Sequence, residues 1–227
     1  PCFRQLLLLV KDWAVEEKEK LIVIGGGAAG FFTAISAAEK NPQAEIIILE
    51  GGNRVLRKVK ISGGGRCNLT HHCFDPLELS KHYPRGSREL RGAFHHWQPG
   101  DTIEWFEKKG VKTNTESDGR MFPVSNQSQT IIDCLQQSSR KLGVSIQLNQ
   151  RVSGIVKEKD KWKLHLSSGD TMTADKVCLA LGSLKESNIL NQLRALDHTI
   201  HPLIPSLFAF NLPNHPMKDL SGLSVKN

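Results

Sequence analysis

The sequence has no hydrophobic run that could cross a membrane. Its longest purely apolar N-terminal run, residues 6–10, falls far short of the roughly 20 residues that a transmembrane helix needs. The same stretch has too short an apolar core for a signal peptide, and no small-residue cleavage site follows it. We therefore expect no membrane partner and a cytoplasmic protein, with an organellar location as the alternative.

The cysteines are few, odd in number and without any CxxC pair. Five are present, and an odd count without paired spacing disfavours a disulfide framework and indicates reduced thiols. Cysteine and histidine do cluster at 67–73, but zinc sites normally show a second ligand pair at a fixed spacing. The three nearest histidines, at positions 82, 95 and 96, fit no such spacing. We expect no metal site.

Composition excludes a disordered or fibrous chain and leaves an ordinary globular one. Among the 227 residues, 39% are hydrophobic and 23% are charged. The formal net charge of +7 favours anionic partners such as nucleic acid or a phosphate-bearing cofactor. A basic stretch carries four cations, but it lacks interleaved aromatics, and Tyr83 is the only tyrosine of the chain. A nucleic-acid partner is therefore disfavoured; the stretch comprises Lys81, Arg85, Arg88 and Arg91.

A strand, a glycine turn, a helix and a second strand follow one another near the N-terminus. Residues 21–24 are a continuous apolar run of β-type residues, and residues 45–50 (EIIILE) enclose a second one between two glutamates, as in strands buried on both faces of a parallel sheet. Residues 31–40 are rich in alanine and apolar at helical spacing, and Asn41-Pro42 ends them. The pattern predicts a βαβ unit.

The rest of the chain indicates a mixed α/β domain. We expect mostly loop at 51–70, a helix at 101–109 capped by Asp101, and a helix at 128–142 capped by Ser128. Residues 150–173 predict a β-meander, and a buried strand at 176–181 and a helix at 189–196 follow it. No internal repeat or low-complexity segment is present.

The glycine turn has the spacing of a dinucleotide-binding site. Gly25 permits a tight turn, Gly27 lets the backbone approach a pyrophosphate, and Gly30 lets the helix pack closely on the strand. Unpaired N–H groups at the helix start then favour phosphate. Glu50, at the end of the second strand, can accept hydrogen bonds from a ribose diol. A glutamate at this position favours FAD or NAD over NADP.

A second glycine-rich motif favours FAD over NAD. Residues 57–68 read RKVKISGGGRCN, with three glycines that allow a close backbone approach to a flat or phosphorylated ligand. Arg66 and Lys60 can neutralise phosphate charge, the arginine as a planar fork. A domain that binds only NAD has no evident need for this loop, and a flexible basic loop is the alternative.

Together these motifs resemble the BaiN/YhiN-like flavoproteins, also known as aminoacetone-oxidase-type FAD-binding oxidoreductases. The resemblance runs from about residue 21 to the last residue. Its segments are GGGAAG at 25–30, LE at 49–50, KVKISGGGRCNLT at 58–70, HYPRG at 82–86, GRMFPVSNQSQTIIDCL at 119–135, ALGS at 180–183, PSLFAFNL at 205–212 and LSGLSV at 220–225.

The resemblance implies a fold, a cofactor and a set of contacts. It implies a Rossmann-like FAD-binding domain at 21–204, with a parallel sheet, a β-meander and a loop or helical excursion at about 70–127. An N-terminal extension would occupy 1–20, and 205–227 would begin an inserted β-rich substrate domain. The implied cofactor-binding residues are Gly25, Gly27, Ala28, Ala29, Gly30, Glu50, Lys60, Ser62, Gly63, Gly64, Gly65, Arg66, Cys67, Asn68, Val152, Ala180 and Gly182.

The sequence departs from the family pattern in two places. Many members carry ATGG where this chain has Ala180-Leu181-Gly182-Ser183, which puts direct flavin contacts of that loop in doubt. Members also continue well beyond the LSGLS phrase and return with a glycine-rich segment that completes the flavin pocket. We therefore expect this chain to be a C-terminally truncated member.

The function implied is that of an FAD-dependent oxidoreductase, reduced by NAD(P)H and acting on a small organic substrate. The alternatives are a flavin-containing RNA-binding or tRNA-modification protein and an inactive truncated fragment. Cys67, Arg120 and Ser125 are candidate catalytic residues, although a structural thiol and a loop salt bridge are the plainer interpretations of the first two. No pattern indicates an oligomeric state.

Overall fold

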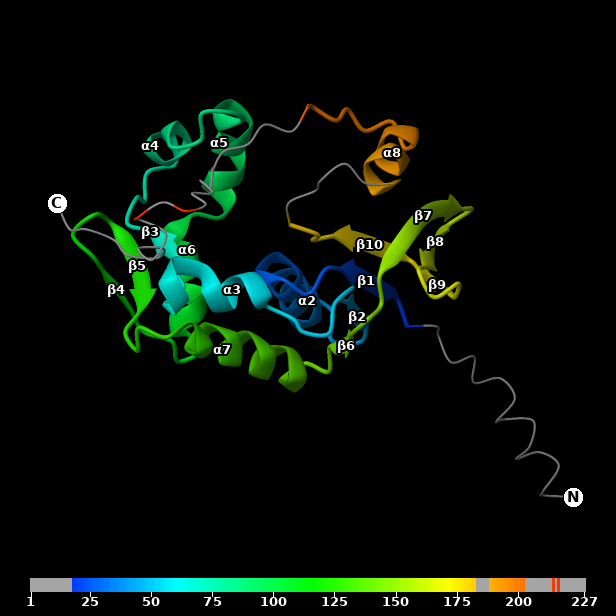
Figure 1. Ribbon diagram of the computed structural model, residues 1–227, viewed down its shortest axis with the longest axis horizontal. Coiled ribbons are helices and arrows are strands. Elements are labelled where there is room, and N and C mark those ends of the chain that lie inside the picture. The colour runs from blue at the N-terminus through cyan, green and yellow to red at the C-terminus, as the bar shows by residue number, and fades with distance from the viewer. Residues whose placement is uncertain (1–17, 183–187, 203–213, 215, 217–227) are drawn as a thin grey trace, which may run out of the picture.

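A four-stranded parallel sheet forms the centre of the protein in the computed structural model, which describes residues 18–182, 188–202, 214 and 216 (Figure 1). The strands are β1 (Lys20–Ile24), β2 (Glu45–Leu49), β6 (Ser145–Gln147) and β10 (Lys176–Leu179), in the order β10-β1-β2-β6. Helix α2 (Ala28–Lys40) connects β1 to β2, and the two strands pair in parallel. The predicted βαβ unit is confirmed.

Each face of the sheet is covered by a different layer. Val23 packs among buried residues of α2 and α7 (Ser128–Lys141), while Ile22 and Ile24 pack toward the meander. The meander consists of β7 (Val152–Glu158), β8 (Lys161–Leu166) and β9 (Thr171–Ala174), paired antiparallel. Because successive side chains of a strand point to opposite faces, one apolar run supplies two cores. This gives a helix, sheet and meander sandwich.

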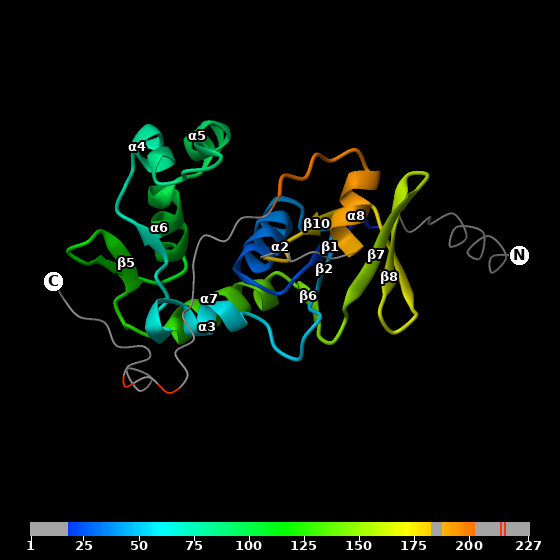
Figure 2. The ribbon, with the colours of Figure 1, turned by 45° about the horizontal axis from the view of Figure 1, so that its top comes forward.

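The chain between β2 and α7 leaves the sandwich and forms a small unit at the far end from the meander (Figures 1 and 2). A three-stranded antiparallel sheet there has the order β3-β5-β4. Helix α8 (Asn188–Ala195) follows β10 and packs on β7. The elements of the excursion are α3 (Arg57–Ile61), a 3-10 turn (Ser62–Gly65), β3 (Thr70–His71), α4 (Pro76–Lys81), α5 (Ser87–His96), α6 (Pro99–Glu107), β4 (Thr113–Thr115) and β5 (Arg120–Pro123).

Two local expectations are wrong, and a third missed one element. The stretch 51–70 is mostly loop and turn as expected, but it also contains the short helix α3. Gln98, not Asp101, caps α6: Asp101 is the third helical residue and accepts the Gln98 backbone N–H at 2.8 Å in a capping box. Ser128 is the first residue of α7 and donates its hydroxyl to the Lys60 carbonyl at 2.9 Å instead of capping the helix.

The predicted fold class is confirmed for the described part of the chain: a Rossmann-like α/β domain with a parallel sheet and a β-meander. The expected second domain at 205–227 lies outside the described residues, apart from 214 and 216. In the part of the chain that the structure describes, no helix is both long and apolar enough to span a bilayer.

Candidate functional site

The glycine turn between β1 and α2 is held by close backbone contacts. Gly25 has a φ of +115°, and a methyl group there would overlap the carbonyl oxygen of Ala180. A methyl group at Gly30 would overlap the carbonyl oxygen of Gly25. The Gly25 N–H donates to the Leu49 carbonyl at 2.8 Å, which ties the turn to the end of β2. Both glycines are therefore required by packing, as predicted for Gly25 and Gly30.

Gly27 differs from Gly25 and Gly30 because it faces open space. A methyl group added at this position would meet no atom within 4 Å, although Gly27 is the N-cap of α2. No side chain caps the helix, no acidic residue lies in its first turn, and Ala28 and Ala29 are exposed. The start of α2 thus offers N–H groups and a positive dipole end to an anion.

Glu50 stands beside this turn with its carboxylate already oriented. One oxygen accepts the Gly26 N–H at 2.9 Å and the other accepts the Gly52 N–H at 2.8 Å. A carboxylate has about four lone-pair directions, so each oxygen keeps room for a hydroxyl donor. The geometry therefore fits the predicted contact with a ribose diol.

A cavity of about 590 Å³ opens next to Glu50, and we call it the Glu50 cavity. Three predicted cofactor residues line it together: Gly25, Glu50 and Val152. Two arginines that the sequence analysis did not select, Arg57 and Arg151, line it as well. Arg57 could have been selected, because it is the first residue of the basic motif. Nothing in the local sequence marks Arg151, which lines the cavity because it directly precedes β7.

The triple glycine adopts a conformation that other residues avoid. Gly63, Gly64 and Gly65 all have positive φ values, of 56°, 67° and 86°. A methyl group at Gly63 would also lie 2.8 Å from the backbone nitrogen of Asn68 and 2.9 Å from the Phe122 ring. The left-handed region costs a residue with a side chain roughly 1–2 kcal/mol. The motif therefore makes a tight left-handed turn, across which the Cys67 N–H donates to the Ser62 carbonyl at 3.0 Å.

Helix α3 separates the two lysines of the basic motif. The Lys60 ammonium donates to Gln129 of α7 at 2.9 Å, away from the glycine turn. Lys58 lies on the other side, where a methyl group at Gly182 would be 3.3 Å from its Nζ. Two helical residues two apart point about 200° from each other, which explains the difference. Lys58 is thus the lysine near the turn, and sequence reasoning missed it because it expected a loop.

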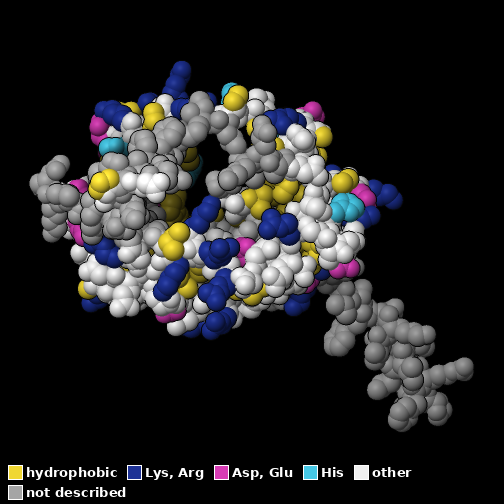
Figure 3. Space-filling model, in the orientation of Figure 1, with side chains coloured by type: hydrophobic (Ala, Val, Ile, Leu, Met, Phe, Trp, Pro, Cys, Tyr) yellow, Lys and Arg dark blue, Asp and Glu magenta, His cyan; other side chains and the backbone are white. Residues whose placement is uncertain are grey.

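A second cavity, of about 520 Å³, is lined by residues at the start of α2, and we call it the Phe32 cavity. Five predicted cofactor residues line it, joined by apolar side chains that the sequence analysis did not select, such as Phe32 and Trp97. The predicted ones are Ala28, Ala29, Ser62, Cys67 and Asn68. Figure 3 shows the molecule hollowed near its middle, with hydrophobic side chains inside and Lys or Arg side chains below.

The predicted segment at 180–182 passes the glycine turn. The Ala180 N–H donates to the Ile24 carbonyl at 2.8 Å, and the Ala180 carbonyl lies against Gly25. Gly182 is exposed, with a φ of +74°, and stands next to Lys58. Ser183 lies outside the described residues.

Cys67 lines the Phe32 cavity as a protonated thiol. Burial raises its pKa above the ordinary value, and a hydrogen bond with Ser62 opposes that rise only in part. A thiolate is the reactive form of cysteine, so this environment favours a packing role. Its φ of +63° is left-handed again, after the right-handed Arg66 at a φ of −94°.

Arg66 makes internal contacts. Its guanidinium pairs with Glu116 at 2.6 Å and lies 3.9 Å from the centre of the Phe122 ring. Arg66 therefore ties the glycine-rich turn to the small sheet, and its contact with phosphate stays a prediction.

Arg120 and Ser125 line neither cavity. Arg120 donates from Nε to Asp118 at 2.7 Å, and hydrogen bonds from the Arg120 backbone and side chain lower the pKa of Asp118. The Ser125 hydroxyl shares a hydrogen bond of 2.6 Å with the Thr130 hydroxyl in the first turn of α7. For Arg120 this is the loop salt bridge named as the plainer interpretation.

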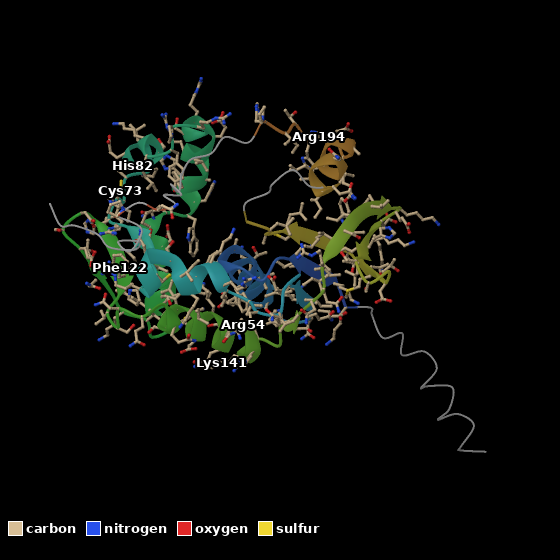
Figure 4. The ribbon with its side chains drawn as sticks, in the orientation of Figure 1. Arg54, Cys73, His82, Phe122, Lys141 and Arg194 are labelled. Carbon is tan, nitrogen blue, oxygen red and sulfur yellow. The ribbon has the colours of Figure 1, made fainter. Side chains whose placement is uncertain are left out.

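The cysteine and histidine cluster does not assemble a metal site in the described part of the chain. No group of three or more His, Cys, Asp or Glu side chains there is placed to hold an ion. Figure 4 shows Cys73 and His82 in the small unit, near α4.

Comparison with known families decides the relationship. The model of a family described as "HI0933-like protein Rossmann domain" matches residues 19–198. The chain belongs to this family. The match spans the parallel sheet, the excursion and the meander, and it confirms the resemblance inferred from the glycine motifs.

Two relatives of different named function are similar to this chain. A 3-dehydro-bile acid delta(4,6)-reductase of Clostridium scindens is 29% identical over 200 residues, covering 86% of this chain and 48% of its own length. A ribosomal RNA dihydrouridine synthase of Escherichia coli is 29% identical over 139 residues, covering 61% and 34%. The chain thus spans half or less of these relatives.

Solved structures support the fold. Thermovibrio ammonificans THI4 has a TM-score of 0.55 at 11% identity and covers 87% of this chain and 69% of that one. E. coli quinol fumarate reductase FrdA has a TM-score of 0.53 at 16% identity and covers 72% and 32%. At these identities the likeness concerns the fold alone.

Proposed function

We propose that this chain provides the FAD-binding part of an oxidoreductase that is reduced by NAD(P)H and acts on a small organic substrate. One observation carries the proposal: Gly25, just before the uncapped start of α2, lines the Glu50 cavity, and Ala28 and Ala29 at that start line the Phe32 cavity. The Glu50 cavity, the start of α2 and the Phe32 cavity would then take the adenosine, the pyrophosphate and the flavin ring, which follow one another in this order along FAD.

The residues fit that cofactor piece by piece. Glu50 and the Val152 backbone would hold the adenosine, and Gly27 with the first N–H groups of α2 would hold the pyrophosphate. Lys58 adds positive charge beside the turn. The bound flavin supplies the redox chemistry, and the protein orients it and limits access of water.

The electron donor is proposed from the same family relationship. One relative is named as a reductase, and a reduction needs a donor of two electrons. A nicotinamide coenzyme is the donor class that we propose here. The choice between NADH and NADPH is an outcome of the experiment below.

The test begins with the colour and titration of the purified protein. We expect it to bind FAD at one equivalent and to lose the visible flavin absorbance when NADH or NADPH is added without oxygen. Lys58→Gln should weaken FAD binding, and Lys60→Gln, on the opposite side of α3, is the matched control. A folded protein that takes up no FAD on reconstitution would refute the proposal.

A second candidate function is reduction or binding of RNA. It is favoured by the named rRNA relatives and by the exposed cations Arg88 and Arg91 on α5. A salt-sensitive mobility shift with rRNA or tRNA would support it, since each phosphate contact contributes to the salt slope. Replacing both arginines with glutamine should then abolish the shift, and the same change at Arg140 and Lys141 of α7 serves as the control. No binding at low salt removes this candidate.

A further inference from the structure

We infer that Asn188 of α8 selects adenine at the Glu50 cavity, and that Gln192 of the same helix positions it there. The inference rests on the proposed function, because it names the residues that would choose the base of the proposed dinucleotide. Sequence reasoning selected no residue of α8 and assigned the adenosine to Glu50 and the Val152 backbone.

Helix α8 is fixed on the outer strand of the meander. The strand order is β7-β8-β9, so β8 pairs with only one edge of β7, and α8 packs on β7 (Figure 2). The Gln192 amide serves the other edge as a neighbouring strand would. Its Oε1 accepts the Ile155 N–H at 2.8 Å, and its Nε2 donates to the Ser153 carbonyl at 3.4 Å. Gln192 thus ties α8 to β7, and the buried Ile189 and Leu190 add apolar packing.

The Ser153 carbonyl receives a second amide from α8. Asn188 precedes Gln192 by four residues, so both side chains lie on one face of the helix. The Asn188 Nδ2 donates to the Ser153 carbonyl at 3.2 Å. The register of β7 against β8 shifts between Val152 and Gly154, which leaves Ser153 as the extra residue of a bulge. The bulge therefore presents one carbonyl to both amides.

These elements form the side of the Glu50 cavity where the base would lie. Asn188 and Ile189 line the cavity from α8, and Val152 and Ser153 line it from β7. The ribose is assigned to Glu50 and the adenine to the Val152 backbone, so the base would lie against α8 and β7. Asn188 is then the amide of α8 next to the base.

The Ser153 carbonyl fixes which way the Asn188 amide faces. One N–H of Asn188 is used on this carbonyl, whereas its other N–H and its Oδ1 have no partner among the described residues. Asparagine pairs with adenine by accepting from the N6 amino group and donating to N7. Hypoxanthine has an oxygen in place of that amino group, which would face Oδ1 without a hydrogen between them. Turning the amide over would set Oδ1 against the Ser153 carbonyl instead, and this leaves the carbonyl unpaired.

Other polar side chains of the cavity lack this fixed acceptor. Arg57 and Arg151 donate hydrogen bonds and accept none, so they do not bind an amino group. Gln150 also lines the cavity, but its side-chain amide makes no hydrogen bond within the described part of the chain. Because that amide is free to turn over, it suits adenine and hypoxanthine equally. Asn188 is therefore the residue that we expect to distinguish the two bases.

The test is a calorimetric titration of the protein with ADP and with IDP, in which hypoxanthine replaces adenine. We expect ADP to bind about tenfold more tightly than IDP, as is typical of a base contact through two hydrogen bonds. Asn188→Ala should make the two Kd values nearly equal. Asn191→Ala is the matched control, because this exposed asparagine of α8 does not line the cavity, and it should leave the preference unchanged.

Gln192→Ala tests positioning, because Gln192 does not line the cavity. It should lower the ratio of the two Kd values, whereas a merely structural role would weaken ADP and IDP equally and overturn the role of Gln192. Equal affinity of the unchanged protein for ADP and IDP would overturn the inference, as would absence of ADP binding to folded protein. A preference that survives Asn188→Ala, or that Gln150→Ala removes, would overturn it as well.

The same titrations separate this inference from the proposed function. FAD uptake and bleaching by NADH or NADPH are measured on the same protein. A protein that takes up FAD and is bleached but binds ADP and IDP equally overturns the choice of base by Asn188 and leaves the oxidoreductase standing. A protein that prefers ADP through Asn188 but takes up no FAD supports the choice of base and refutes the proposed function.

Discussion

Two alanine substitutions in the glycine turn, only three residues apart, should have opposite effects. Gly27→Ala is expected to leave the stability of the cofactor-free protein nearly unchanged and to weaken FAD binding. Gly30→Ala is expected to destabilise the protein itself. The difference follows from the space around each glycine: none of the protein lies within 4 Å of a methyl group at Gly27, whereas one at Gly30 overlaps the Gly25 carbonyl oxygen.

For Gly27 the stability terms nearly cancel. Its φ of −88° and ψ of −172° are open to alanine, which stabilises by about 0.4–1 kcal/mol through the unfolded chain. Alanine is a poorer N-cap than glycine, which destabilises the variant by a similar amount, of the order of 0.5–1 kcal/mol. The methyl group then occupies the approach to a phosphate, and each charge-assisted hydrogen bond lost is about 1.5–3 kcal/mol. We expect a tenfold to hundredfold weaker Kd, about 1.4–2.8 kcal/mol.

For Gly30 the overlap is with backbone that cannot move alone. The Gly25 carbonyl belongs to a turn tied to β2 through the Gly25 N–H and the Leu49 carbonyl. Overpacking of this kind typically costs about 1–3 kcal/mol, and we expect the upper end here because no flexible side chain can yield. That is a large share of a typical stability of about 5–15 kcal/mol.

Two measurements separate these effects. Urea unfolding of the cofactor-free variants gives the free energy of unfolding, and equilibrium dialysis followed by flavin absorbance gives the Kd of the folded protein. The reasoning is refuted if Gly27→Ala lowers stability as much as Gly30→Ala does and its folded fraction binds FAD normally, because Gly27 would then serve packing alone.

Four further predictions concern the glycine-rich motif. Lys58→Gln should weaken FAD binding several-fold in dialysis and Lys60→Gln should not, since only Lys58 lies beside Gly182; equal effects would contradict the helical phase of α3. Burial raises the pKa of Cys67, so its alkylation by iodoacetamide, followed by peptide mass spectrometry, should be slow at neutral pH and accelerate only above the ordinary thiol range. The same raised pKa should lower stability as the pH rises from the ordinary thiol pKa toward the raised one. Gly63→Ala should lower the urea midpoint more than Gly64→Ala, because both incur left-handed strain of about 1–2 kcal/mol but only Gly63 meets the Asn68 nitrogen. If the two variants lower the urea midpoint equally, left-handed backbone strain alone explains both losses and the contact with the Asn68 nitrogen adds nothing.

Local signals made the βαβ unit predictable. The buried strands β1 and β2 show up as continuous apolar runs, and the turn between β1 and α2 depends on glycines whose roles follow from steric rules. Glu50 followed from its spacing to Gly30. Each of these features is decided within about thirty residues of chain, so tertiary contacts had little left to change.

Tertiary contacts decided what the sequence analysis missed. Helix α3 has only five residues and begins after Leu56, which has a left-handed φ of 56° and is 1% exposed. Helices this short are marginal alone, so packing on α7 and the hydrogen bond from Ser128 to the Lys60 carbonyl stabilise it. The choice of Lys60 over Lys58 was a consequence of missing that helix. Pro99 was a usable signal for the start of α6, because proline favours the first helical position.

The state of Glu50 connects the fold to the proposed function. Its two oxygens accept N–H groups from both glycine segments, Gly26 and Gly52, before any ligand is present. A ribose would therefore meet a carboxylate whose rotamer is already fixed, and binding would lose little side-chain entropy. The hydrogen bond from Gly26 also joins the end of β1 to the end of β2, where ligands of open α/β sheets bind. One side chain thus stabilises the edge of the sheet and orients the site, so stability and cofactor affinity should be coupled at this position.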